Sequence, residues 1–116
     1  RHQCYETTRL VADYLELKPG TFSTSFQSRL AGDKWLDPYT DKTIENFAKT
    51  GTKYMAVVTP AFVSDCLETL EEIGIEAVED FEDNGGENLH VVPCINDREG
   101  WIKVLSRWID EWAVAS

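Results

Sequence analysis

The stretch Tyr54–Gly74, YMAVVTPAFVSDCLETLEEIG, decides the fold of this chain. Its first five residues form an apolar run without polar alternation, which predicts a strand of a parallel sheet that is covered on both faces. After Thr59 and Pro60, apolar residues recur at spacings of three and four, which predicts a helix that ends at Gly74. This apolar stripe consists of Phe62, Val63, Cys66, Leu67, Leu70 and Ile73. A strand that leads into a helix is the repeating unit of an α/β fold.

Three glutamates, Glu68, Glu72 and Glu76, follow one another at intervals of four residues. Like charges four apart on a helix repel each other by about 0.2–0.5 kcal/mol, so the row does not stabilise the helix. Carboxylates in such a row offer oxygen ligands to a cation, or an acceptor for protons. The alternative interpretation is a solvated acidic face on an acidic protein. The place of Glu76 stays open, because Ile75–Phe81 fits either a further helical turn or a short strand.

Length and composition limit the classes of protein that the chain can belong to. Its 116 residues fit one domain, and no apolar run approaches the roughly 20 residues that span a bilayer. The net charge of −10 argues against nucleic acid as a partner and is compatible with a cation or a cationic partner. Cys4, Cys66 and Cys94 are odd in number and widely spaced, which fits neither a disulfide framework nor a zinc site. We therefore expect a reducing, cytoplasmic setting.

The segments around the central stretch alternate between helical and strand patterns. Helices are predicted at 4–17, at 41–50 and after Asn96-Asp97, which we expect to cap the last helix. Strands are predicted at 21–30 and 89–92, and a turn at 83–86. The last helix carries a broad apolar stripe that predicts deep docking: Trp101, Ile102, Leu105, Trp108, Ile109 and Trp112.

This alternation predicts an α/β domain with a mainly parallel sheet covered by helices on both sides. Only three strands are visible, so we expect an earlier strand upstream of Arg1 and interpret the chain as a piece of a longer protein. The loop 31–39 contains Trp35, which is either an anchor packed on the core or a ligand contact. Glycine-rich phosphate loops, GxSxG and HExxH are absent from the sequence.

Three blocks of the sequence resemble ferrochelatases. They are PAFVSDCLETLEEIGIE (residues 60–76), SFQSRLAGDKWLDPYTD (residues 25–41) and HVVPCIND (residues 90–97), and together they span nearly the whole chain in the family's order. The resemblance implies a three-layer, chelatase-like α/β domain, with residues 1–116 as the C-terminal half of a two-domain protein. It also implies a tetrapyrrole cleft between the halves and insertion of ferrous iron into a porphyrin, a lyase step of haem biosynthesis without an organic cofactor.

The resemblance also assigns roles to individual residues. Glu68 matches the family's catalytic carboxylate in the S-D-x-x-E-T-L motif, here residues 64–70, and Glu72 and Glu76 match outer acidic positions of a metal path. Trp35 matches a tryptophan of the porphyrin cleft. Cys66 departs from the family pattern, because many members have His at that position. We place Gln27, Ser28 and Cys66 with Trp35 among the candidate substrate contacts. The family's essential histidine would precede Arg1, and neither His2 nor His90 matches it.

The chemistry that the resemblance implies is proton removal and transient metal binding by Glu68. Neighbouring carboxylates raise one another's proton affinity, so we expect the row to raise the pKa of a glutamate toward the operating pH. The expected partners are the N-terminal half of the same polypeptide, a porphyrin and ferrous iron, and a peripheral membrane contact is compatible with them. We expect the 116 residues alone to be inactive.

Two further interpretations assign the chain to other classes of protein. The first is a non-catalytic α/β module that binds a tetrapyrrole or a metal, which the upstream sequence would distinguish from the enzyme. The second is an iron–sulfur cluster, which some ferrochelatases hold; we do not expect one, because four cysteine ligands are usual and the chain has three.

Overall fold

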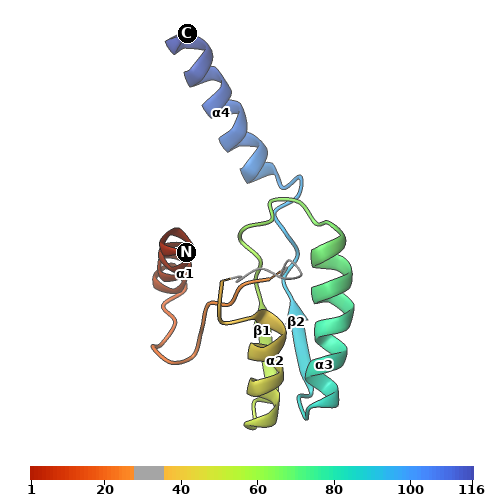
Figure 1. Cartoon of the computed structure of the whole chain (residues 1–116). Helices are drawn as coiled ribbons and strands as arrows, with labels where there is room; N and C mark the ends of the chain where they lie inside the picture. The colour runs from red at the N-terminus through yellow and green to blue at the C-terminus, as the bar shows by residue number, and fades with distance from the viewer. Residues whose placement is uncertain (28–35) are drawn as a thin grey trace.

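The structure, a computed structural model, describes residues 1–27 and 36–116. Along the chain it has α1 (His2–Tyr14), α2 (Thr40–Lys49), β1 (Tyr54–Val57), η1 (Glu68–Ala77), α3 (Val78–Asp83), β2 (Asn88–Val91) and α4 (Glu99–Ala115). The element η1 is a π-helix that continues without a break into α3. Figure 1 shows α2 and the η1–α3 helix beside the two strands, with α4 projecting away from them.

The two strands β1 and β2 lie side by side and run parallel, with Met55 opposite Leu89 and Val57 opposite Val91. Parallel neighbours need a crossover connection, and here the η1–α3 helix supplies it. The predicted mixture of helices and parallel strands is therefore confirmed, as a small two-stranded sheet within the described residues. The larger three-layer arrangement stays a prediction.

The strand predicted at 21–30 is wrong over its described part, residues 21–27. This segment forms one isolated parallel bridge, between Phe26 and Tyr39, and no continuous ladder. Its hydroxyl side chains bond to neighbouring helices instead: Thr24 Oγ1 donates to Thr8 Oγ1 at 2.7 Å, and Ser25 Oγ lies 3.0 Å from Thr40 Oγ1. Residues 28–30 lie outside the described residues.

The core lies between one face of the sheet and two helices. Buried residues of α2, η1, α3 and β2 form it, with partly buried strand residues packed against them: Ile44, Ala48, Ala77, Phe81 and Leu89, with Met55, Val57, Val78 and Val91. The helix predicted at 41–50 is confirmed as α2, in which Ile44 and Ala48 are each 3% exposed. Alternation along a strand sends Met55 and Val57 to the same face, which is why this face packs on the helices.

The opposite face of the sheet is open in this chain. Tyr54 is 72% exposed, and Ala56 and His90 are exposed beside it. The prediction that β1 is covered on both faces is therefore wrong for the described residues, because α2 and α3 pack on the same side. Tyr54 instead donates a hydrogen bond from its phenol to Glu87 Oε2 at 2.6 Å.

The predicted turn at 83–86 is confirmed, and it fixes the start of β2. Gly85 has a φ of +107°, a backbone conformation that residues other than glycine rarely adopt. A Cβ at Gly86 would lie 2.2 Å from Cε1 of Phe81, whose side chain is fully buried. The Gly86 amide donates to the Phe81 carbonyl at 2.8 Å. The turn therefore closes over the central aromatic residue of the core.

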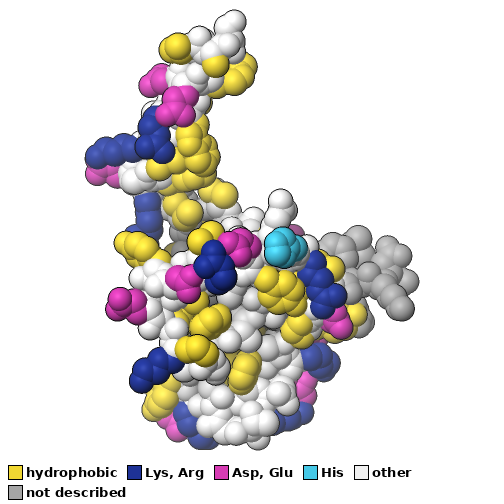
Figure 2. All heavy atoms as spheres, turned by 90° about the vertical axis from the view of Figure 1, so that its left-hand side faces the viewer, with side chains coloured by type: hydrophobic (Ala, Val, Ile, Leu, Met, Phe, Trp, Pro, Cys, Tyr) yellow, Lys and Arg dark blue, Asp and Glu magenta, His cyan; other side chains and the backbone are white. Residues whose placement is uncertain are grey.

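The first and last helices bury little of their apolar surface in the described chain. The helix predicted at 4–17 is confirmed as α1, anchored by the edge-to-face pair Tyr5–Phe26 with ring centroids 5.9 Å apart, yet Tyr14 is 88% exposed. Helix α4 has no buried residue, and Figure 2 shows hydrophobic side chains along the projecting helix. The prediction of deep docking for Trp108 and Trp112 is thus wrong within the described residues. No helix in them is long and apolar enough to cross a membrane.

Candidate functional site

The candidate site is built on η1, where the predicted helix end at Gly74 is wrong. The chain runs helically through Gly74 from Glu68 to Asp83. In a π-helix each amide bonds to the carbonyl five residues earlier, so the backbone crowds at that spacing. A Cβ at Gly74 would lie 3.2 Å from the carbonyl oxygen of Thr69, a tight approach that glycine avoids. The glycine therefore favours the wide turn instead of ending the helix.

The wide turn aligns residues that are four apart along the helix. The buried face consists of Thr69, Ile73 and Ala77, which are 2%, 2% and 6% exposed. Each of the three glutamates immediately precedes one of these residues in the sequence, so the row of Glu68, Glu72 and Glu76 runs along the edge of the buried face. Glu68 and Glu72 are half-buried and Glu76 is exposed. The open question about Glu76 is thereby resolved, because it continues the row on the same helix.

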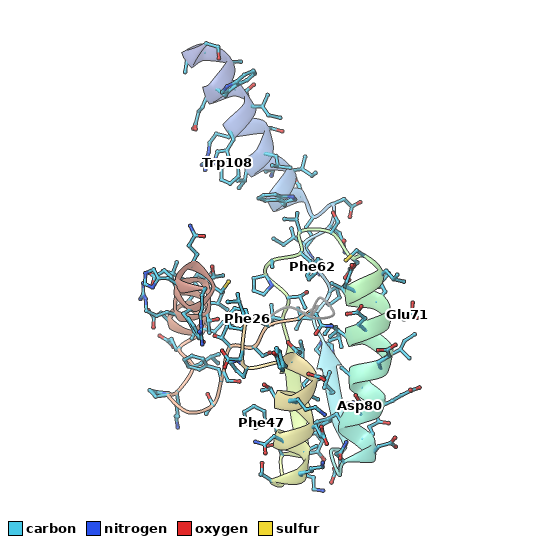
Figure 3. All side chains as sticks on the ribbon, in the orientation of Figure 1. Phe26, Phe47, Phe62, Glu71, Asp80 and Trp108 are labelled. Carbon is cyan, nitrogen blue, oxygen red and sulfur yellow. The ribbon has the colours of Figure 1, made fainter. Side chains whose placement is uncertain are left out.

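A polar hollow of about 300 Å³ lies beside this row. Gln27 and Glu72 both line it, and Gln27 Nε2 donates to Glu72 Oε2 at 2.5 Å. Its remaining lining comes from the bridge region, α2 and the η1–α3 helix: Phe26, Tyr39, Thr40, Asp41, Ile73, Glu76, Ala77 and Asp80. Two separate blocks of the sequence, around residues 27 and 72, thus meet at one surface. Figure 3 labels Phe26 and Asp80 at this region.

Sequence reasoning missed Asp41 and Asp80 as lining residues of the hollow. A signal for Asp80 was present, because it follows Glu76 at the same interval of four. It was missed because the segment 75–81 fitted a strand as well as a helix. No comparable signal marks Asp41, which lies in the first turn of α2.

A second, wide-open hollow of about 550 Å³ lies on the other side of the start of η1. It is lined by Cys66, Leu67, Leu70, Glu71, Ile75 and Glu76. Leu67 and Leu70 are 67% and 60% exposed, so two members of the predicted apolar stripe face outward instead of into the core. Glu76 borders both hollows, whereas Cys66 lines only this one.

The ionisation of Glu68 differs from the expectation. The Cys66 thiol and a backbone amide donate hydrogen bonds to the Glu68 carboxylate and lower its pKa, while partial burial opposes them more weakly. The predicted raising of the pKa by the neighbouring carboxylates is wrong here, because the hydrogen bonds stabilise the charged form directly. Glu68 is therefore ionised at neutral pH and can accept a proton or contact a cation.

Some of the predicted site residues are not described by the structure, and those that are described do not form a metal site. Trp35 and Ser28 lie outside the described residues. Glu68, Glu72 and Glu76 lie along one helix edge, but within residues 1–27 and 36–116 no three His, Cys, Asp or Glu side chains converge as ligands of one ion. All three cysteines are free thiols, exposed at Cys4, half-buried at Cys66 and buried at Cys94.

Comparison with known proteins identifies the family to which the chain belongs. The family model described as ferrochelatase matches residues 1–113. A curated ferrochelatase from Brucella anthropi is 52% identical over 105 residues, which cover 90% of this chain and 30% of the relative. Ferrochelatases from Brucella abortus and Brucella ovis are 51% identical over the same length. The chain thus spans about 30% of the length of these curated relatives. Because the family model covers nearly every residue, the chain belongs to the ferrochelatase family.

Proposed function

We propose that this chain is part of an enzyme that inserts ferrous iron into a porphyrin, with Glu68 as the proton acceptor and a contact for the incoming metal. Membership of the ferrochelatase family supports the reaction. The observation that carries the proposal is the row of Glu68, Glu72 and Glu76 on one continuous helix, beside a polar hollow that Glu72 and Glu76 line. We assign this activity to a full-length polypeptide and not to the chain alone, because the chain spans only about 30% of the length of such a relative.

Metal insertion requires that two pyrrole N–H protons leave the ring and that the ion loses bound water. An ionised carboxylate at the ring can take a proton and can replace a water as an oxygen ligand. The lowered pKa of Glu68 keeps it ionised before the porphyrin binds. A porphyrin laid against Glu68 would remove water from it, and desolvation raises the pKa of a carboxylate. Glu68 would then be a stronger base at the moment when the protons leave.

Glu72 and Glu76 are proposed to pass the ion toward Glu68. Exposure rises along the row from the half-buried Glu68 and Glu72 to the exposed Glu76, which is the order expected of a path from solvent inward. Single carboxylates suit this role, because a substrate ion must be released again. The described residues contain no converging set of three ligands that would hold the ion in place.

The rest of the proposed cleft comes from other parts of the polypeptide. We propose that Trp35, Ser28, Gln27 and Cys66 contact the porphyrin and that an N-terminal half supplies the opposite wall. The open sheet face and the exposed α4 leave apolar surface for such a half to cover. A cytoplasmic setting, a chelatase-like three-layer fold over residues 1–116, a peripheral membrane contact and the absence of an organic cofactor are parts of the same proposal.

The test compares a full-length polypeptide that contains these residues with the 116-residue chain. Each is mixed anaerobically with a porphyrin and ferrous iron, and the change of the porphyrin absorption bands to those of the metalloporphyrin is followed. We expect turnover by the full-length polypeptide and none by the chain alone. Porphyrin binding without insertion by the full-length polypeptide would overturn the proposed reaction and leave a binding module. Turnover by the chain alone would overturn the two-walled cleft.

A further inference from the structure

The segment that leads into η1 is tied to the loop after β2 by a group of hydrogen bonds that we call the Asp65–Asn96 strap. Asn96 Nδ2 donates to Asp65 Oδ2 at 2.8 Å, and the Asp65 amide donates back to Asn96 Oδ1 at 2.8 Å. The Asn96 amide donates to the Val63 carbonyl at 2.9 Å. The Asn96 side chain therefore bonds to the carboxylate and the amide of Asp65, and the Asn96 backbone amide bonds to the Val63 carbonyl. Both partners lie more than 30 residues away in the sequence.

The backbone at Asn96 restricts which residues can form the strap. Asn96 has a φ of +53°, in the left-handed region where only glycine, asparagine and aspartate are common. Among these three, only asparagine offers both a donor to the Asp65 carboxylate and an acceptor for the Asp65 amide. The strap therefore accounts for the residue type at position 96, which does not cap α4 as expected from the sequence.

The strap continues through Thr69 to the first turn of η1. Thr69 Oγ1 donates to Asp65 Oδ1 at 2.9 Å and accepts from the Cys66 amide at 2.9 Å. Thr69 is only 2% exposed, so water cannot replace these bonds easily. Glu68 directly precedes Thr69 and is the first residue of η1, so the backbone that Thr69 anchors also carries the Glu68 carboxylate. A connected set of hydrogen bonds thus runs from Asn96 to Thr69, the neighbour of the glutamate that the proposed reaction uses.

We propose that Asn96 is a positioning residue for metal insertion, which holds the first turn of η1 so that the Glu68 carboxylate meets the reacting ring. The inference rests on the proposed function, since it assigns a role within that reaction. Asn96 itself touches neither the metal nor the porphyrin in this proposal. Displacing a reacting group by about 1 Å can lower a rate about 100-fold, so a loosened strap should reduce kcat.

The test uses two single substitutions and their combination in the full-length polypeptide. N96D keeps the side-chain shape and tolerates a positive φ, but it sets a second carboxylate against Asp65. D65N leaves one acceptor oxygen, so residue 65 can no longer accept both from Asn96 Nδ2 and from the Thr69 hydroxyl and the Cys94 amide. The double variant D65N/N96D exchanges the two partners, restores every donor–acceptor pair and leaves the net charge unchanged. The matched control is N46D, which makes the same chemical change at an exposed position of α2.

We expect N96D and D65N each to lower kcat about 10-fold or more, with little change in the KM for the porphyrin and an unchanged absorption spectrum of the bound porphyrin. The double variant should recover most of the lost kcat, and N46D should behave like the unchanged protein. Hydrogen exchange gives a readout independent of activity. Exchange of the Cys66 and Leu70 amides, measured in a peptide of residues 64–70, should quicken in the single variants and slow again in the double variant.

A positioning role and a merely structural role of Asn96 give different outcomes. Unchanged kcat in both single variants, or a double variant no better than either of them, would overturn the positioning role while leaving the proposed function intact. Equal losses of kcat and of porphyrin binding would show a general structural role and would also overturn it. An unchanged protein that inserts no metal would overturn the proposed function, and the positioning role with it.

Discussion

At the scale of single residues, the charge of Glu68 is decided by contacts within hydrogen-bond distance and not by the row to which it belongs. The other glutamates are four and eight residues away, at a partly exposed helix edge where water and salt weaken their repulsion. The Cys66 thiol, by contrast, donates directly to the Glu68 carboxylate and lowers its pKa. The contact with Cys66 is therefore the largest influence on the pKa of Glu68, although the two residues belong to different positions of the predicted stripe and row.

Replacing Cys66 by alanine should raise the pKa of Glu68 toward its ordinary value of 4.5, because the strongest stabilising hydrogen bond disappears. The expected shift is measured by following the Glu68 carboxyl carbon during a pH titration by NMR. C4A is the matched control, since Cys4 is exposed on α1 and distant in the sequence. An unchanged Glu68 pKa in C66A would show that the thiol is not the cause.

At the scale of elements, the sequence predicts the helices and strands better than it predicts which helix face is buried. The elements β1 and α2, the turn before β2 and the parallel strands follow from apolar runs, helical spacing and glycines, and the structure contains them. The apolar stripe predicted for residues 62–73 from an α-helical period is not buried as expected. Of its six residues only Ile73 is buried: Phe62, Val63, Cys66 and Leu67 precede η1, where the chain is not yet in the π-helix, and within η1 the buried positions are Thr69, Ile73 and Ala77.

A hydrogen-bond pattern of the π type could not be deduced from the local sequence. It depends on Gly74, which accepts the close carbonyl of Thr69, and on the packing of Phe81 in the core at the far end of the same helix. The row of glutamates itself was visible in the sequence. Its alignment with the buried face, and its continuation to Glu76 and Asp80, required the helix to pass through a glycine that usually ends one.

The pair Ile73 and Ile75 tests the phase of η1. Ile73 is 2% exposed and Ile75 is 52% exposed, although they are two residues apart on one helix. I73A should destabilise the 116-residue chain by about 2–5 kcal/mol, because it leaves a cavity in the core. I75A should change the free energy of unfolding by no more than about 0.5 kcal/mol. Urea unfolding followed by circular dichroism measures both, and equal losses would contradict the buried face described for η1.

At the scale of the whole molecule, apolar patterns predict that a surface is buried but not which part of a protein covers it. The stripe on the last helix predicts deep docking, and Trp108 and Trp112 are instead 51% and 71% exposed (Figure 3 labels Trp108 on α4). The same holds for Tyr14 on α1 and Tyr54 on β1. The chain spans about 30% of the length of its curated relatives, and we propose that the remainder of such a polypeptide covers these surfaces.

The exposure of α4 can be measured with a variant that keeps Trp108 as its only tryptophan. In the 116-residue chain we expect red-shifted emission and efficient quenching by acrylamide, since half of this side chain meets water. In a full-length polypeptide the emission should shift to the blue and the quenching constant should fall. The same quenching in both proteins would mean that the rest of the polypeptide leaves α4 uncovered.

We propose that Glu68 itself, and not merely an acidic helix, accepts protons and contacts the metal during insertion. The most direct test compares E68Q with E71Q in a full-length polypeptide, because Glu71 lies on the same helix but outside the row of Glu68, Glu72 and Glu76. Both changes remove one carboxylate and keep the side-chain shape, and the rate of ferrous iron insertion into a bound porphyrin is measured. We predict that E68Q binds porphyrin but loses insertion, whereas E71Q retains it. Unimpaired insertion by E68Q, or an equal loss in E71Q, would contradict the claim.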